Sequence, residues 1–242
     1  MSVRLKVPWV LDDAYSEVAV GLLEEYFGRE GQPRYSGAYF QEVGGRGDGE
    51  HVKDVIRAED ALAVNALSVS VPARAACRLL SAGIASAVTD LLRDIPPDVH
   101  LVEDRADVSE MSPAWQLWDL LRDKQRVGLG PTTTSKLMAR KRPRLIPIYD
   151  SVIAAVLGLP DSRGHWAGMQ ELTRVKGNAL HEHAKRLTER TGLDERVEPL
   201  RAVDVVLWMH GTDPARSRRI ADEHGLAVPN ESDPPSPRKR LR

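Results

Sequence analysis

The sequence predicts an all-α protein, and three observations lead to this prediction. Apolar residues recur at the spacing of an amphipathic helix along most of the chain. Segments typical of β-strands are scarce, and no alternation of strand and helix is found. Glycine and proline mark the ends of the helical segments. With 242 residues, of which 42% are hydrophobic and 29% charged, the chain is long enough to bury a core without a disulfide or metal.

The first part of the chain, residues 1–111, predicts a region of short helices. Its first helix ends at Gly28, because glycine is favoured where a chain leaves a helix. Pro72 fits the first turn of another helix, where its missing N–H costs no hydrogen bond. A turn-rich segment, 31–49, separates the first two helices. The helices expected in this region cover 15–27, 58–67, 72–80 and 86–95.

The second part, residues 112–228, predicts a further helical region. One helix opens at Ser112-Pro113 and another at Pro131, and Pro199 again fits a first-turn position. The remaining helices are expected at 151–158, 165–175, 178–191, 198–210 and 214–225. The last residues, 229–242, are rich in proline and serine and end in Arg-Lys-Arg-Leu-Arg. That composition is typical of a disordered basic tail.

Apolar residues that share helix faces in the second part form the expected core. They are Leu117, Leu120, Leu121, Leu137, Val152, Ile153, Val206 and Leu207. Trp115 and Trp118 stand three residues apart on one predicted helix, so they either join this core or stack an extruded base. Burial statistics favour the core.

Composition excludes several classes of protein. Cys77 is the one cysteine, which excludes a disulfide framework, a four-cysteine zinc site and a cysteine-ligated iron–sulfur cluster. No apolar run approaches the roughly 18 residues of a membrane span. The first residues, Met-Ser-Val-Arg-Leu-Lys-Val-Pro, lack the apolar region and cleavage site of a signal peptide. We therefore expect a cytoplasmic protein that has no membrane partner.

Charge is distributed unevenly along the chain. The net charge is only -1, but residues 112–149 carry eight Lys and Arg against Asp119 and Asp123. The rest of the chain is correspondingly acidic. A basic segment within an acidic protein is a candidate contact for a polyanion.

A short motif within this basic segment, Gly128-Leu129-Gly130-Pro131-Thr132-Thr133, lies between two predicted helices. Gly128 and Gly130 permit a tight turn, and Pro131 then opens the second helix. The first-turn amides of that helix, at Thr132 and Thr133, have no partner within the helix and form an anion site. Four cations follow on the same helix and are called the basic cluster here: Lys136, Arg140, Lys141 and Arg142. We expect these residues together to bind the phosphate backbone of duplex DNA.

This hairpin resembles the helix-hairpin-helix motif, and two later segments extend the resemblance. The run Pro147-Ile148-Tyr149-Asp150-Ser151-Val152-Ile153 places an aspartate twenty positions after Gly130, and Asp204-Val205-Val206-Leu207-Trp208-Met209-His210-Gly211 is similar to a His-Gly-ended closing helix. Residues 112–211 thus resemble the helix-hairpin-helix GPD superfamily of DNA glycosylases, the relatives of endonuclease III and adenine glycosylase. The run from Lys141 to Asp150 also resembles an uncharacterised actinobacterial family with no established activity.

The resemblance implies a two-lobed helical glycosylase fold in which Asp150 is the catalytic carboxylate. In that superfamily the aspartate stabilises an oxocarbenium-like sugar or activates a water while the base–sugar bond of a flipped nucleotide breaks. Bifunctional members carry a Schiff-base lysine at the position of Thr132, which implies a monofunctional DNA glycosylase here. The cysteine cluster of some members is absent, which implies a fold without an iron–sulfur cluster. No cofactor and no metal are expected.

The residues themselves leave a second function open. An aspartate at the start of a helix commonly caps the first amides of that helix. Asp150 would then be only an N-cap, and the chain would be a non-catalytic helix-hairpin-helix DNA-binding protein. Both functions use the hairpin and the basic cluster, so Asp150 is the residue that distinguishes them. A structural helical protein, whose hairpin packs against a protein partner, would leave the basic cluster unexplained.

Overall fold

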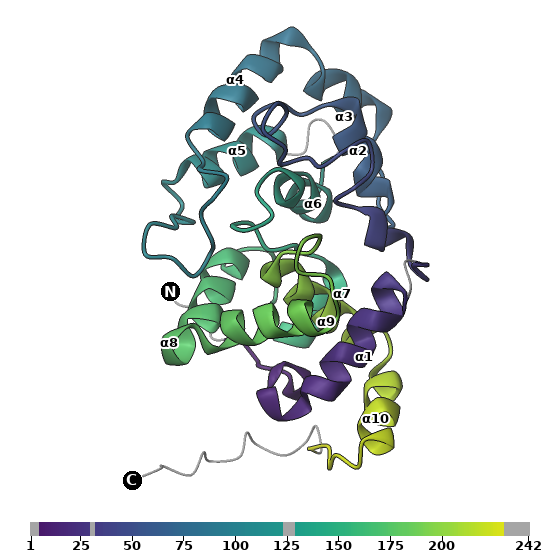
Figure 1. Ribbon diagram of the computed structural model, residues 1–242. Helices are drawn as coiled ribbons and strands as arrows, with labels where there is room; N and C mark the ends of the chain where they lie inside the picture. The colour runs from purple at the N-terminus through teal and green to yellow at the C-terminus, as the bar shows by residue number, and fades with distance from the viewer. Residues whose placement is uncertain (1–4, 30–31, 123–128, 230–242) are drawn as a thin grey trace.

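The computed structural model describes residues 5–29, 32–122 and 129–229, and within these ranges the protein consists of helices and turns without a strand (Figure 1). The all-α prediction is confirmed. The helices are α1 (Ser16–Phe27), α2 (Ala58–Asn65), α3 (Ala73–Leu79), α4 (Ala82–Arg93), α5 (Pro113–Arg122), α6 (Pro131–Lys141), α7 (Ser151–Leu157), α8 (His165–Arg190), α9 (Pro199–Thr212) and α10 (Pro214–Glu223). Short 3-10 helices add Trp9–Leu11, Asp13–Tyr15 and Ser36–Tyr39. The expected tail lies outside the described residues from 230 onward.

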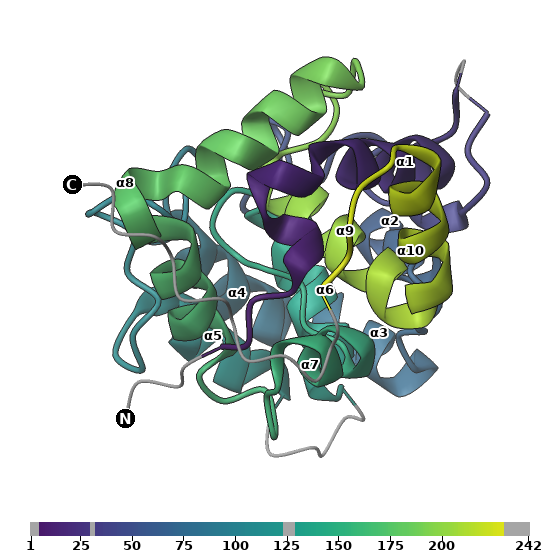
Figure 2. The ribbon, with the colours of Figure 1, turned by 90° about the horizontal axis from the view of Figure 1, so that it is seen from below.

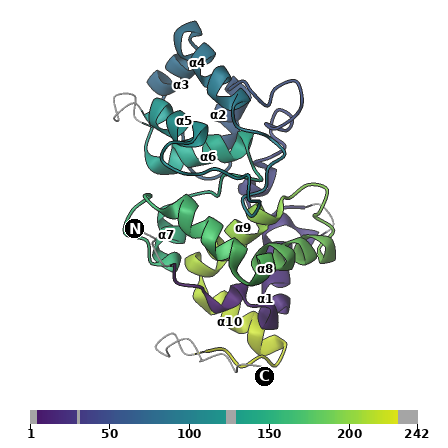
Figure 3. The same cartoon turned by 90° about the vertical axis from the view of Figure 1, so that its left-hand side faces the viewer.

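The helices gather into two groups (Figures 1 and 3). One group contains α1, α7, α8, α9 and α10, and the other contains α2 to α6. The chain crosses to the second group after α1 and returns after α6. Each region expected from the sequence, 1–111 and 112–228, therefore contributes helices to both groups.

Helix α9 lies at the centre of the first group. It packs against α1, α7, α8 and α10, and Figure 2 shows α1, α8 and α10 on the face seen from below. Every residue from Leu200 to Leu207 is buried. The sequence explains this position, because a helix that is apolar on nearly all sides must be surrounded by protein.

Local sequence signals set several helix ends as expected. Gly28 follows α1 with φ of 81°, a conformation that costs an L-residue with a side chain far more than glycine. Pro199 occupies the first turn of α9. The helical backbone geometry of α8 is interrupted at Val175–Asn178, where three consecutive residues have positive φ. This break matches the expectation of two helices, 165–175 and 178–191. Helix α4 differs, since it begins at Ala82 rather than at 86.

The expected core is largely confirmed. Six of its eight residues are buried, and Leu120 and Val152 are partly buried. Trp118 and Trp166 are also buried. Trp166 makes edge contacts with both Trp115 and Trp118, and Trp115 lies stacked beside Trp118. Trp118 is therefore a core residue, while Trp115 remains partly exposed at the edge of this tryptophan cluster.

No single helix within the described ranges has the length and hydropathy of a membrane span. Helices α3 and α4 reach that length and hydropathy only as a pair, and they are bent by 69° relative to each other.

Candidate active site

Asp150 lies where the chain returns from the second helix group and begins α7. Its backbone is extended, and its Oδ1 accepts a hydrogen bond of 2.9 Å from the amide of Ile153. Asp150 is therefore an N-cap, as the second of the two functions requires. The cap uses only one carboxylate oxygen, and 12% of the side chain is exposed.

The other oxygen of Asp150 faces a lysine from the opposite helix group. Asp150 Oδ2 lies 3.9 Å from Lys136 Nζ, and the same ammonium donates a 3.0 Å hydrogen bond to the carbonyl of Leu67, just beyond α2. Burial lowers the pKa of Lys136, and the nearby carboxylates of Asp150 and Asp204 oppose that shift. Lys136 thus joins α6, the end of α2 and the start of α7.

The segment before Asp150 is held by hydrogen bonds from two helices. Ser135 Oγ on α6 accepts a 2.7 Å bond from the amide of Tyr149 and donates a 3.2 Å bond to the carbonyl of Pro147. His165, the first residue of α8, places Nε2 at 3.1 Å from the carbonyl of Ile148. Burial lowers the pKa of His165 to about 4, so at neutral pH the ring is uncharged and its Nε2–H is the donor. The position of Asp150 is therefore fixed from both sides.

A second acidic group lies in the same region. Asp204 on α9 is buried and accepts a hydrogen bond from Arg201, which also donates to the hydroxyl of Tyr26 at 2.9 Å. Burial raises the pKa of Asp204 to about 6 although Arg201 opposes the shift, and Asp150 raises it further. Sequence analysis missed the Arg201–Asp204 pair. Its signal was present, because two opposite charges three residues apart interrupt an otherwise apolar helix.

The expectation that the basic cluster forms an exposed surface is corrected by the structure. Lys136, Arg140, Lys141 and Arg142 are all buried. Arg140 donates hydrogen bonds to the carbonyls of Phe40, Val43 and Gly45 and forms an ion pair with Asp60. These partners leave its guanidinium directed into the protein rather than toward solvent.

The two following cations have the same kind of environment. Lys141 donates 3.1 Å bonds to the carbonyls of Gly47 and Val52 and forms a 2.5 Å ion pair with Asp60. Arg142 donates to the carbonyls of Lys53, Leu92 and Ile95 and pairs with Asp54. Most of these carbonyls belong to segment 40–57, which has no α-helix to satisfy them, and buried carbonyls require donors.

The hairpin is described only from its second glycine onward. Gly130 is the N-cap of α6 and Pro131 its first residue, and no side chain caps this helix end. Thr132 is partly buried and Thr133 is buried. The first glycine, Gly128, lies outside the described residues. Helix α6 therefore begins at Pro131, as the sequence predicts, and the anion site at its first-turn amides stays a prediction.

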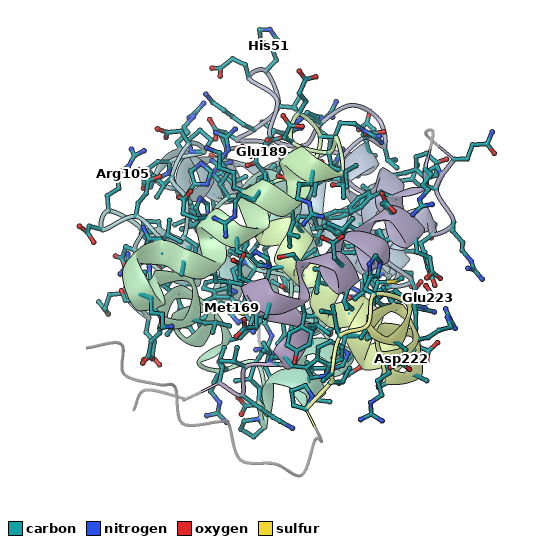
Figure 4. The ribbon with its side chains drawn as sticks, turned by 60° about the horizontal axis from the view of Figure 1, so that its bottom comes forward. His51, Arg105, Met169, Glu189, Asp222 and Glu223 are labelled. Carbon is teal, nitrogen blue, oxygen red and sulfur yellow. The ribbon has the colours of Figure 1, made fainter. Side chains whose placement is uncertain are left out.

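Other features of the described residues lie apart from Asp150. No group of three or more His, Cys, Asp or Glu is arranged to hold a metal ion in these ranges. A hollow of about 610 Å³ is lined by residues of the 102–105 loop together with Arg174 and Asn178. Arg105 projects from its rim at the surface (Figure 4). None of the groups around Asp150 lines this hollow.

Comparison with known proteins gives one match. No curated protein and no solved structure matches the chain. A family model described as "Family of unknown function (DUF6308)" matches residues 19–211, a range that starts within α1, ends within α9 and leaves out α10. The match contains no link to the helix-hairpin-helix glycosylases, so that resemblance remains a proposal. Because the model covers well over half of the chain, the protein belongs to the DUF6308 family.

Proposed function

We propose that the protein is a helix-hairpin-helix, DNA glycosylase-like hydrolase that cleaves a base–sugar N-glycosidic bond with Asp150 as the catalytic carboxylate. The observation that supports this most is the placement of Asp150. Its carboxylate lies 3.9 Å from Lys136 of the other helix group, and the cap occupies only one of its oxygens. Supporting hydrogen bonds to the preceding segment hold it there.

The chemistry suits a fixed carboxylate. As the bond between the base and C1′ breaks, its electron pair leaves with the base and positive charge develops on the sugar. A negative group that is already in place stabilises this charge without reorganising. Water then supplies the oxygen that bonds to C1′ and releases a proton, which Asp150 would accept either directly or through solvent.

DNA contact is assigned to the backbone rather than to the basic cluster. Because the four cations are buried, the phosphate contact in this proposal falls to the amides of Thr132 and Thr133 and to the backbone of Gly128 and Gly130. The N-terminus of α6 carries the positive end of the helix dipole. The basic cluster then supports α6 from inside.

One observation favours the second candidate function. The 2.9 Å bond from the Ile153 amide to Asp150 is a complete N-cap, so the residue has a structural role whether or not it is catalytic. In that case the chain is a DNA-binding protein without excision activity.

Excision by the wild-type protein and by Asp150→Asn separates the two functions. A panel of damaged and modified duplexes is incubated with each protein, and abasic sites are revealed by alkali. We expect Asp150→Asn to excise about 10²–10³-fold more slowly and to bind duplex as the wild type does. Asp213→Asn is the matched control, because Asp213 also caps a helix through its side chain but belongs to α10.

The product distinguishes the mechanism further. Because Thr132 stands where bifunctional glycosylases carry their Schiff-base lysine, strands with an abasic site should stay intact until alkali is added. Trapping of a covalent protein–DNA adduct by borohydride would contradict the monofunctional mechanism. If no substrate were processed and Asp150→Asn lowered stability as much as Asp213→Asn does, Asp150 would be a cap only.

A further inference from the structure

The four residues from Pro147 to Asp150 form a short link between α6 and α7 that carries the proposed catalytic group. This link has no regular secondary structure, so its own backbone does not hold it in place. Three of its backbone groups are nevertheless bonded to side chains, and these side chains come from two different helices, α6 and α8.

Ser135 binds the link at two points. Its hydroxyl is fully buried on α6, and it bonds to groups on either side of Ile148, the amide of Tyr149 and the carbonyl of Pro147. One hydroxyl acting as both donor and acceptor therefore fixes the rotation of two successive peptide units. Lys136, the next residue of α6, lies against Asp150 itself.

His165 bonds to the second of these peptide units, the one that joins Ile148 to Tyr149, from its opposite side. Its Nε2–H donates to the carbonyl of Ile148, and its ring makes an edge contact with Tyr149 at a centroid distance of 5.4 Å. Its Nδ1 is buried and has no hydrogen-bond partner among the described residues. The ring is therefore in the Nε2–H tautomer, and Ile148 is its hydrogen-bond partner among the described residues.

We propose that Ser135 and His165 are positioning residues that fix the orientation of the Asp150 carboxylate by holding the 147–150 link from opposite sides. Their importance for catalysis rests on the proposed function, whereas the restraint on the link can be measured without activity. Misplacing a reacting group by about 1 Å can cost a factor of roughly 10² in rate. Neither side chain needs to touch the substrate for this effect.

Amide hydrogen exchange of Tyr149 tests the restraint directly. In Ser135→Ala this amide loses its acceptor, and we expect it to exchange at least about fivefold faster, the factor that corresponds to a typical net hydrogen bond. The amide of Val205 in α9 reports global unfolding in the same spectra. Ser135→Thr keeps the hydroxyl and should restore slow exchange.

Thr134→Val is the matched control on the same helix. Thr134 is fully buried like Ser135, but its hydroxyl has no partner among the described residues, so the substitution removes a hydroxyl without breaking a bond. His165→Leu removes the second contact, and His165→Gln retains a donor. This pair keeps the test decisive if Ser135→Ala does not fold.

Kinetics then connect the restraint to the reaction. With a substrate that the wild type processes, Ser135→Ala and His165→Leu should lower kcat about 10–100-fold while KM changes little. Wild-type exchange at Tyr149 in both variants, or equal effects from Thr134→Val, would overturn the proposal, and so would a loosened link with unchanged kcat. If the wild type excised no base but the Tyr149 amide exchanged faster in Ser135→Ala, the glycosylase function would be refuted, whereas the restraint on the link would be confirmed.

Discussion

The middle of helix α6 and its C-terminal end both carry a buried cation, and they have different roles. At its C-terminal end, Arg140 and Lys141 extend into the second helix group and bond to carbonyls of segment 40–57. In the middle of the helix, Ser135 and Lys136 face the link that begins α7. The C-terminal end thus organises an irregular segment, and the middle holds the candidate catalytic group. The number of positive charges in a segment therefore does not reveal how many of them reach the surface.

The irregular segment explains why so many cations are needed inside the protein. Between residues 40 and 57 the chain makes successive turns with little repeating hydrogen bonding. Arginine offers five donors in a fixed plane, which suits several carbonyls that converge from different directions. Asp60 balances part of the charge by pairing with both Arg140 and Lys141.

The largest effect is expected at the C-terminal end of α6. Arg140→Met leaves the carbonyls of Phe40, Val43 and Gly45 without a donor and Asp60 with a single ion-pair partner. We expect the free energy of unfolding in urea to fall by more than about 3 kcal/mol. Arg163→Met, at a side chain that is 84% exposed, should change it by less than about 0.5 kcal/mol. Near wild-type stability of Arg140→Met would show that the cation does not hold the segment.

The next largest effect on the free energy of unfolding is expected from His165, and this effect depends on pH. Because burial lowers its pKa to about 4 from an unfolded value near 6.5, the folded state favours the neutral ring. This contribution is complete above pH 6.5 and is lost as the pH falls toward 4, by up to about 3 kcal/mol. His165→Gln keeps a donor but does not titrate, so its stability relative to the wild type should rise over that interval. A constant difference from pH 7 to pH 4 would contradict the buried neutral histidine.

The smallest effect is expected in the middle of the same helix. Lys136→Met removes one hydrogen bond to Leu67 and one distant ion pair, so we expect a loss of about 1–2 kcal/mol. Since the ammonium is buried, the salt dependence of duplex binding should not change. A shallower salt slope in Lys136→Met would show that this cation neutralises a phosphate, and the contrast between the middle of α6 and its C-terminal end would then be wrong.

Sequence analysis predicts features with local causes well. Gly28, Pro199 and the interruption of α8 near Asn178 are encoded by the residues at those positions, and each is found where expected. The cap at Asp150 is likewise a local signal. The start of α4 at Ala82 was missed because Gly83 lowers helix propensity, while packing of the following apolar face overrides it.

Features with distant causes could not be predicted in the same way. The burial of Arg142 depends on carbonyls at Lys53, Leu92 and Ile95, and nothing in the local sequence indicates that they converge on it. The same applies to Arg201, whose partner Tyr26 lies 175 positions away. A run of cationic residues can lie on the surface of a protein or in its interior, and only the tertiary structure shows which of the two applies.

The central position of α9 bears on the order in which the protein is completed during synthesis. Helices α2 to α6 form one uninterrupted stretch of chain, so their group can assemble as soon as that stretch has emerged from the ribosome. Helix α1 emerges first, yet the helices it packs against, α8, α9 and α10, all lie near the other end. Its apolar face, which includes Leu22 and Leu23, can therefore be fully covered only after those helices have been translated. Until then the nascent chain exposes part of a helix face that the finished protein buries.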